Sequence, residues 1–328
     1  MERKPKVLVT FPSGFPYCER DEVNFRQALP HGDFFFCHDG KIPEELLELI
    51  EIWIGNAPVP QLEKSTNLKW LQVFASGVDQ YAQAANRLPP GMIVTNVTGA
   101  FGLTISEYML GVLLMMMRNL HLYRDLQTKN IWQRLDRADS ICGSRVLVVG
   151  LGDIGGEFAG RAKALGAYTV GIRRTPGIKP DYVDELYTME ALDNELSKAD
   201  VVALSLPGTT ETRGLFHAER LKKIKKGAYI VNVGRGNAIE CDSLTGLLRD
   251  GSLKGVALDV TDPEPLPAGH PLWNEPNAVI TPHCSGNYTL GETVNRIRGI
   301  ILENLALYGA GKPLKNMVDL SAGYRVKK

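Results

Sequence analysis

A glycine-rich turn between an apolar strand and a helix constrains the fold of this chain more than any other feature. Residues 146–149 are all aliphatic and predict a buried strand, and residues 154–165 predict a helix that stops at a glycine. The turn between them has G-x-G-x-x-G spacing, with Gly150, Gly152 and Gly155. The first glycine permits a tight turn, the second lets the backbone approach a pyrophosphate, and the third lets helix and strand pack closely. Together with the free N–H groups of Asp153 and Ile154 at the helix start, this pattern predicts a Rossmann dinucleotide site.

Apolar runs alternate with helical patterns on both sides of this turn, which predicts an α/β fold with parallel sheets covered by helices. A first series of strands is expected at residues 7–10, 34–37, 52–54 and 70–74. A second series is expected at residues 145–149, 168–172, 200–206, 229–233, 255–260 and 278–281. Helices are expected at residues 43–50, 189–198, 241–250 and 290–308, and a long Leu- and Met-rich helix at 104–129 separates the two series.

Composition excludes several classes of protein. The 328 residues suffice for two domains, and equal numbers of acidic and basic residues leave no global positive field for nucleic acid or an anionic membrane. The five cysteines are widely spaced without a C-x-x-C, so neither a disulfide framework nor a thiolate metal site is expected. The uncharged run 108–117 is far shorter than the ~20 residues of a membrane span, and the N-terminus lacks an apolar stretch of signal-peptide length. We therefore expect a metal-free, cytoplasmic protein.

The end of the strand at 168–172 bears on the choice of dinucleotide. NAD sites usually place a carboxylate there to accept a hydrogen bond from the ribose 2′-OH. This chain has Arg173 and Arg174 instead, and a guanidinium can bind the 2′-phosphate of NADP. The pair favours NADP, with use of both cofactors or two simply solvated arginines as the alternatives.

Polar side chains follow three strands of the second series. Arg235, Glu264 and His283 each come shortly after a predicted strand end. Open α/β sheets bind their ligands at the carboxyl ends of the strands, so these side chains are expected to converge near the nicotinamide.

With these segments in order, the chain resembles the D-isomer-specific 2-hydroxyacid dehydrogenases, which include glyoxylate/hydroxypyruvate reductases and phosphoglycerate dehydrogenases. The matching segments are residues 74–79, 96–107, 150–155, 196–207, 226–236, 255–260, 262–265 and 282–283. The resemblance implies a Rossmann NAD(P)-binding domain at 99–287, inserted into a flavodoxin-like substrate domain at 1–98 plus 288–328.

The resemblance also implies a role for each polar residue in the reduction of a small 2-keto acid such as glyoxylate or hydroxypyruvate. Arg235 would bind the substrate carboxylate and polarise its carbonyl, and His283 would exchange a proton with the carbonyl oxygen. Glu264 would orient the imidazole and favour its charged form. The backbone amides of residues 76–78 would hold the substrate carboxylate, and Asp259 would accept a hydrogen bond from the nicotinamide amide.

Further cofactor contacts and a homodimer follow from the same resemblance. The dimer would pair through the nucleotide-binding domains and the long helix, and the Leu- and Met-rich run 110–117 of that helix agrees with this. The additional residues implied to contact the cofactor are Thr104, Leu206, Pro207, Thr212, Val233, Gly234 and Ser285, and those implied to contact the substrate are Ser76, Gly77, Val78 and Arg235.

Alternatives remain open at this point. Taken one at a time, an Arg, Glu or His is more often a surface residue than a catalytic one, residues 76–78 could be only a tight turn, and Asp259 could merely cap a loop. Formate dehydrogenases of the same superfamily pair their histidine with glutamine, which Glu264 argues against. A dinucleotide-sensing corepressor of the same fold is the alternative from a different class of protein, and turnover of 2-keto acids would distinguish it.

Overall fold

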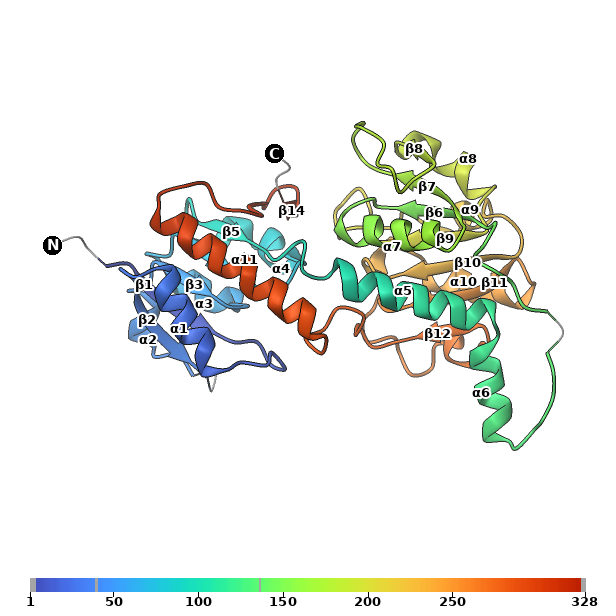
Figure 1. Ribbon diagram of the computed structural model, residues 1–328, viewed down its shortest axis with the longest axis horizontal. Helices are drawn as coiled ribbons and strands as arrows, with labels where there is room; N and C mark the ends of the chain where they lie inside the picture. Colours follow the sequence, from blue (N-terminus) through green and yellow to red (C-terminus); the bar gives the residue numbers. More distant parts are fainter. Residues whose placement is uncertain (1–3, 39–40, 136, 326–328) are drawn as a thin grey trace. The chain divides into compact units, whose positions relative to one another are not determined.

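The fold is described by a computed structural model that covers residues 4–38, 41–135 and 137–325. The chain forms two compact units (Figure 1). Unit 1 comprises Met1–Phe101 and Asn287–Lys328, and unit 2 comprises Gly102–Gly286. The predicted domain limits were residues 98 and 288; the assignment of substrate binding to unit 1 stays a prediction. Among the helices of the described residues, none combines the length and apolar character that a membrane span requires.

Unit 1 is built on a parallel sheet with the strand order β2-β1-β3-β4-β5, which is the flavodoxin-like order. The strands are β1 (Lys6–Thr10), β2 (Asp33–Cys37), β3 (Ile52–Ile54), β4 (Trp70–Gln72) and β5 (Ile93–Thr95). β1, β3 and β4 are almost entirely buried, because helices cover both faces of the sheet. A two-residue pairing of β13 (Val318–Asp319) with β14 (Tyr324–Arg325) lies near the end of the described chain.

Two sets of helices cover the sheet of unit 1. One face packs on α2 (Glu44–Leu47), α3 (Val59–Lys64) and α4 (Asp79–Gln83), around the buried Trp53. On the other face lie α1 (Glu19–Ala28) and α11 (Gly291–Gly309), which pack against each other. Asn304 of α11 donates from Nδ2 to Gln72 Oε1 of β4 over 2.8 Å, which joins the C-terminal segment to the first sheet.

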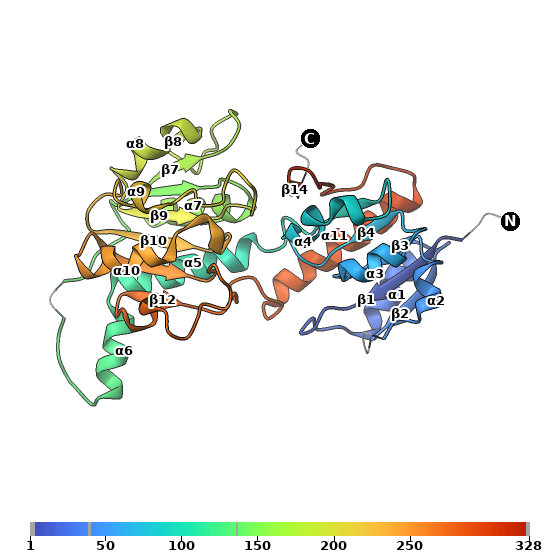
Figure 2. The same cartoon turned by 180° about the vertical axis from the view of Figure 1, so that it is seen from behind.

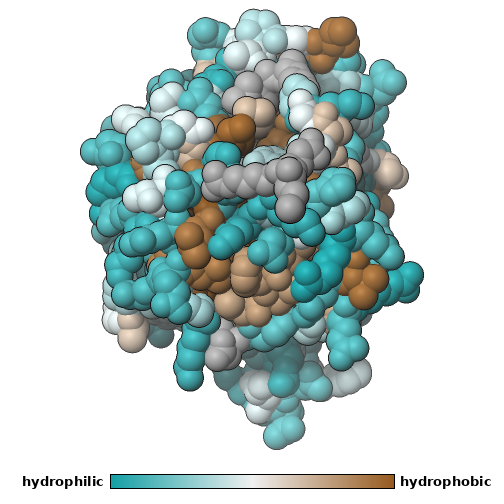
Figure 3. Space-filling model, turned by 90° about the vertical axis from the view of Figure 1, so that its left-hand side faces the viewer, coloured by the Kyte–Doolittle hydropathy of each residue, from teal (hydrophilic) through white to brown (hydrophobic). Residues whose placement is uncertain are grey.

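The surface seen in Figure 3 is mostly hydrophilic, with smaller apolar patches.

Unit 2 is built on a parallel sheet of seven strands with the order β12-β11-β10-β9-β6-β7-β8. If β6 is counted as strand 1 and the sheet is read from β8, the first six strands have the Rossmann order 3-2-1-4-5-6. β12 then adds a seventh strand at the far edge. The predicted fold class is therefore confirmed. The strands are β6 (Arg145–Val149), β7 (Tyr168–Ile172), β8 (Glu185–Tyr187), β9 (Val201–Leu204), β10 (Ala228–Asn232), β11 (Leu253–Leu258) and β12 (Ala278–Ile280).

The helices of unit 2 lie on both faces of its sheet (Figures 1 and 2). α5 (Gly102–Met117) and α7 (Asp153–Ala164) pack against each other on one face. α8 (Leu192–Leu196), α9 (Ala218–Leu221) and α10 (Cys241–Arg249) share an apolar core with the other face. Short 3-10 turns of the two units occupy Ala85–Arg87, Met189–Ala191, Gly236–Ala238 and Pro271–Asn274.

The expectation of a single helix over residues 104–129 is wrong. The segment is two helices, α5 and α6 (Leu120–Thr128), with Asn119 between them at a φ of 55°. Asparagine tolerates this left-handed conformation, which no residue inside an α-helix adopts. α6 buries none of its residues and stands away from the sheet of unit 2 (Figure 1).

Candidate active site

The glycine turn after β6 has the geometry that the sequence predicts for a dinucleotide-binding turn. Gly150 has a φ of +98°, which side chains rarely adopt, and a Cβ on Gly155 would lie 2.2 Å from the carbonyl oxygen of Gly150. A Cβ on Gly152 would meet no heavy atom of the described chain within 4 Å. Two glycines therefore serve the packing of turn and helix, whereas Gly152 borders open space at the N-terminus of α7. That open backbone fits a pyrophosphate.

A serine that sequence reasoning passed over locks this turn. Ser205 Oγ donates to the carbonyl oxygen of Gly150 over 2.7 Å, and a Cβ on Gly150 would lie 2.8 Å from the carbonyl oxygen of Ser205. Ser205 comes directly before the predicted cofactor contacts Leu206 and Pro207. Ser205 could have been found from the sequence as a small hydroxyl residue just past the end of β9, the strand next to β6.

Arg173 follows β7, where the sequence predicts recognition of the adenosine ribose. Its guanidinium lies against Gly177, where a Cβ would come within 2.6 Å of Nη1. The Nε atom is buried and has no hydrogen-bond partner among the described residues. Arg174 is exposed. The position therefore presents arginine, and no carboxylate, at the end of β7.

The loop that carries Arg235 is fixed by close backbone contacts. A Cβ on Gly234 would lie 2.5 Å from the nitrogen of Leu206, and one on Gly236 would lie 1.9 Å from the carbonyl oxygen of Thr261. Asn232, which is fully buried, donates from Nδ2 to the carbonyl oxygen of Arg235 over 3.1 Å. The Arg235 guanidinium itself donates from Nη1 to the carbonyl oxygen of Gly234 over 2.8 Å. These contacts connect the loops that follow the carboxyl ends of β9, β10 and β11.

His283 and Glu264, which are 19 residues apart in the sequence, form a hydrogen-bonded pair. The imidazole Nδ1 lies 2.7 Å from Glu264 Oε1, and both side chains are about half exposed, at 49% and 43%. No other hydrogen bond to the imidazole occurs in the described part of the chain, so Nε2 is available. A carboxylate that accepts from Nδ1 fixes the tautomer and the ring orientation. The structure thus brings together two of the three predicted catalytic side chains.

Asp259 holds the loop on which His283 lies. The residue is 1% exposed, and its carboxylate accepts hydrogen bonds from the backbone nitrogens of Cys284 at 2.9 Å and Ser285 at 3.0 Å. It also accepts a bond from the hydroxyl of Thr281 at 2.6 Å. Burial raises the pKa of this carboxyl, but the bonds from Ser285 and Thr281 outweigh it and hold the pKa below its ordinary value. The carboxylate is therefore charged, and its hydrogen bonds go to the loop that carries His283. Its predicted contact with the nicotinamide stays a prediction.

The remaining predicted cofactor residues lie in three parts of unit 2. Val233 and Leu206 are nearly buried, and the Val233 nitrogen donates to the carbonyl oxygen of Leu204 over 3.1 Å. Thr212 donates from its hydroxyl to the carbonyl oxygen of Pro207 over 2.6 Å, which closes the loop after β9. Thr104 is a partly buried residue in the first turns of α5.

The predicted substrate contacts at residues 76–78 lie in unit 1, between β4 and α4. The Asn96 side chain donates from Nδ2 to the carbonyl oxygen of Ser76 over 2.8 Å, and the carbonyl oxygen of Val78 accepts from Tyr81 over 3.0 Å. No bond from the backbone nitrogens of Ser76, Gly77 or Val78 is found within the described ranges. The turn is thus held through its carbonyls, and its amides are left for another acceptor.

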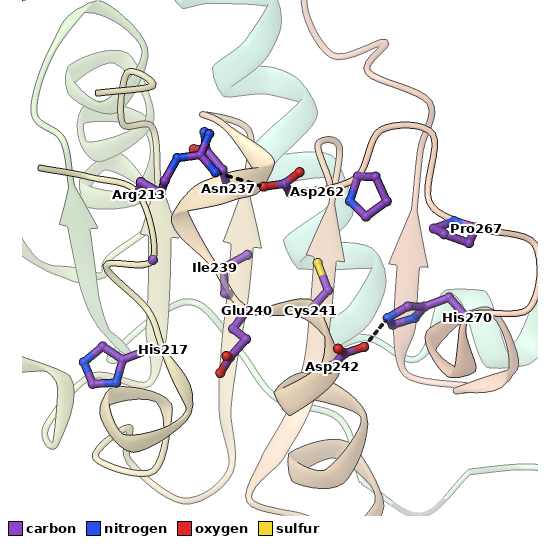
Figure 4. A pocket seen from close by; sticks show the side chains of 12 residues that line it. Arg213, His217, Asn237, Ile239, Glu240, Cys241, Asp242, Asp262, Pro267 and His270 are labelled. Atoms are coloured by element: carbon purple, nitrogen blue, oxygen red, sulfur yellow. Dashed lines mark hydrogen bonds and ion pairs between the residues drawn. The ribbon is translucent and has the colours of Figure 1, made fainter. Parts of the chain in front are cut away.

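A cavity of about 460 Å³ opens beside the loop that precedes Glu264 (Figure 4). Its polar side chains include two pairs, Arg213 with Asp262 at 3.6 Å and His270 with Asp242 at 3.0 Å. None of the three predicted catalytic side chains lines it. The cavity is therefore separate from the side chains that the sequence predicts to be catalytic.

Comparison with known proteins identifies the family. A family model described as the NAD binding domain of D-isomer specific 2-hydroxyacid dehydrogenases matches residues 110–285, more than half of the chain. The chain belongs to this family. It is therefore an NAD(P)-dependent oxidoreductase that acts on the CH–OH group of its donors.

Three relatives illustrate the range of the family. A D-isomer specific 2-hydroxyacid dehydrogenase family protein from Aeromonas salmonicida subsp. salmonicida A449 has 34% identity and a TM-score of 0.84, over 97% of this chain and 100% of that one. Glycerate dehydrogenase of Methylorubrum extorquens is 28% identical over 88% of this chain and 94% of its own length. The NADPH-dependent glyoxylate/hydroxypyruvate reductase of Sinorhizobium meliloti, solved with NADP and sulfate, is 25% identical with a TM-score of 0.81, over 98% and 100% of the two chains.

Proposed function

We propose that this enzyme reduces small 2-keto acids such as glyoxylate or hydroxypyruvate to D-2-hydroxy acids, and that NADPH is its favoured cofactor. The observation that carries the proposal is the His283–Glu264 pair, with Nδ1 held at 2.7 Å from the carboxylate. The names of the Sinorhizobium meliloti and Methylorubrum extorquens relatives support this class of substrate.

His283 is the proton donor of the proposed reduction. When bound, the reduced nicotinamide supplies a hydride to the substrate carbonyl carbon. The charge that builds on the carbonyl oxygen is neutralised by the proton of Nε2, while Glu264 keeps its bond to Nδ1. In the oxidative direction the neutral imidazole accepts the proton of the hydroxyl group through the same nitrogen. Glu264 holds the imidazole in the same orientation in both directions.

Arg235 is the proposed anchor of the substrate. A guanidinium presents several N–H donors in one plane, so it can hold a carboxylate and polarise a neighbouring carbonyl oxygen. The fixed backbone around Gly234 and Gly236 keeps the base of this long side chain in place. The backbone amides of Ser76, Gly77 and Val78 are also proposed substrate contacts, since N–H donors suit a carboxylate.

The preference for NADPH rests on Arg173. An arginine at the end of β7 attracts the 2′-phosphate, whereas the carboxylate of an NAD site would repel it. Arg173 as a whole is only partly buried, so part of its side chain is open to a ligand.

The proposed function is tested by measuring kcat/KM for a panel of 2-keto acids with NADPH and with NADH. We expect reduction of glyoxylate or hydroxypyruvate, with NADPH preferred, and Arg173→Asp should move the cofactor preference about 10- to 100-fold towards NADH. Arg20→Asp, an equal charge change at an exposed residue of α1, is the control and should leave the ratio unchanged. Cofactor binding without turnover of any keto acid would contradict the enzymatic proposal and favour a nucleotide-sensing protein.

We further infer that the chain forms a homodimer, paired through its nucleotide-binding domains and the later part of the segment 104–129. Much of the apolar run 110–117 is internal, with Leu113, Met116 and Met117 at most 1% exposed. Exposed apolar side chains instead occur on α6 and just after it, where Leu120 is 56% and Trp132 is 102% exposed. We define the α6 arm as residues 120–134, and propose that a second copy of the chain covers it.

A further inference from the structure

The loop that carries His283 has a backbone conformation that its own sequence does not favour. His283 has a φ of 49°, in the left-handed region where residues other than glycine are uncommon. Such a conformation persists only where the surrounding structure determines it. The backbone nitrogens of residues 283, 284 and 285 all donate to Asp259, the first to its carbonyl oxygen at 2.9 Å and the others to its carboxylate. The direction of the imidazole therefore depends on how firmly Asp259 is held.

A second chain of hydrogen bonds holds Asp259 from the side of α5. The hydroxyl of Thr281 donates to Asp259 Oδ1 over 2.6 Å, and the hydroxyl of Tyr108 lies 2.5 Å from Thr281 Oγ1. Thr281 has one proton, and Asp259 as a carboxylate can only accept. Because that proton is given to Asp259, Tyr108 must be the donor to Thr281.

Tyr108 is suited to this role. Burial is the main cause that raises the pKa of its phenol to about 12, with the bond to Thr281 opposing and the charge of Asp259 adding to the effect. The phenol therefore keeps its proton over the whole range in which an imidazole titrates. The hydrogen bond that Tyr108 donates orients the Thr281 hydroxyl towards Asp259, and each bond of such a chain strengthens the next.

We propose that Tyr108 is a positioning residue for the proton donor His283, acting through Thr281 and Asp259. The inference rests on the proposed role of His283 as acid and base. Tyr108 does not touch the reacting atoms; it sets the rigidity of the loop at 281–285 and hence the aim of the imidazole.

The test combines the single variants Tyr108→Phe and Thr281→Val with the double variant, using NADPH and the keto acid that turns over best. Tyr108→Phe should lower kcat about 3- to 10-fold and Thr281→Val about 10- to 50-fold, with KM and the Kd of NADPH within about threefold of the parent. The double variant should be no worse than Thr281→Val alone, because both act through one chain of bonds. Thr281→Ser keeps the hydroxyl and should retain near-parental kcat.

Tyr229→Phe is the matched control. Its hydroxyl donates to Asp139 Oδ2 over 2.8 Å in a similarly buried setting, but Tyr229 lies at the opposite end of β10 from Arg235. This variant should leave kcat unchanged. If Tyr108→Phe behaves like Tyr229→Phe, or if the effects of Tyr108→Phe and Thr281→Val multiply in the double variant, the proposal is overturned.

Amide hydrogen exchange of the peptide covering residues 281–286 separates this inference from the proposed function. We expect faster exchange at this peptide in Tyr108→Phe and Thr281→Val, and none of this change in Tyr229→Phe. Faster exchange with unchanged turnover would show that Tyr108 stiffens the loop without affecting proton transfer, and would overturn the positioning role; failure of the proposed function itself would appear as no keto-acid turnover by the parent enzyme. Unchanged exchange would overturn the positioning role, whatever the activity.

Discussion

At the scale of single residues, the unusual backbone of His283 decides how its role is best tested. Alanine at this position would remove the imidazole and would also place a Cβ-bearing residue without a polar side chain at a φ of 49°. Left-handed conformations are tolerated best by glycine and then by asparagine and aspartate. Asparagine therefore removes the acid and base while it keeps the loop close to its native shape.

His283→Asn should lower kcat for keto-acid reduction about 100- to 10,000-fold, because no other group replaces the proton donor. The Kd for NADPH, measured by quenching of protein fluorescence, should change little. His31→Asn, at an exposed histidine of unit 1, is the control for the loss of an imidazole. A His283→Asn enzyme with parental turnover would exclude the residue as the acid.

At the scale of elements, the turn between β6 and α7 separates folding from binding. Gly155 and Gly152 belong to the same pattern in the sequence, yet their surroundings differ. A Cβ on Gly155 would overlap the carbonyl oxygen of Gly150 at 2.2 Å, whereas one on Gly152 would meet nothing in the described chain within 4 Å. The protein itself therefore excludes a side chain at Gly155, whereas at Gly152 only a ligand that approaches the turn would exclude one.

Gly155→Ala should therefore destabilise the protein by about 1–3 kcal/mol, through overpacking between helix and turn. Gly152→Ala should leave the midpoint of thermal unfolding nearly unchanged in the absence of cofactor, but should weaken NADPH binding about 10- to 100-fold. Thermal unfolding with and without NADPH measures both effects. If Gly152→Ala binds NADPH as the parent does, the pyrophosphate does not approach this glycine.

The elements that the sequence could and could not predict differ in a physical way. Strands buried on both faces, such as β6 and β7, are continuous apolar runs and were found with their bounds. β8 (Glu185–Tyr187) was missed because it is short, lies at the sheet edge and is only partly buried. The break at Asn119 was missed because the apolar pattern continues from α5 into α6.

The site divides in the same way. The places of Arg235, Glu264 and His283 after recognisable strands could be predicted from the sequence, whereas their proposed roles come from the resemblance to the family. Tyr108 could not, since its partner Thr281 is 173 residues away and nothing in a local pattern connects them. Hydrogen bonds between distant segments become visible only once the fold is built.

At the scale of the whole molecule, the chain leaves unit 1 once and returns to it once. On its return the chain forms α11, which is attached to the first sheet by the hydrogen bond from Asn304 to Gln72 of β4. A fold of this kind buries its strands well but leaves the α6 arm with no cover of its own among the described residues. Exposed aromatic and aliphatic side chains in one segment are a feature of surfaces that meet another chain.

The dimer proposed above makes this arm essential for assembly. Trp132 is 102% exposed, and a tryptophan that fills a pocket on a partner contributes about 2 kcal/mol or more to association. Trp132→Ser should thus raise the dimer dissociation constant about 30-fold or more, measured by sedimentation equilibrium. Ile178→Ser, at another exposed apolar residue of unit 2 (92% exposed), is the control and should not change it. A parent chain that sediments as a monomer at micromolar concentration, or a Trp132→Ser variant that dimerises as tightly as the parent, would show that a second copy does not cover the arm.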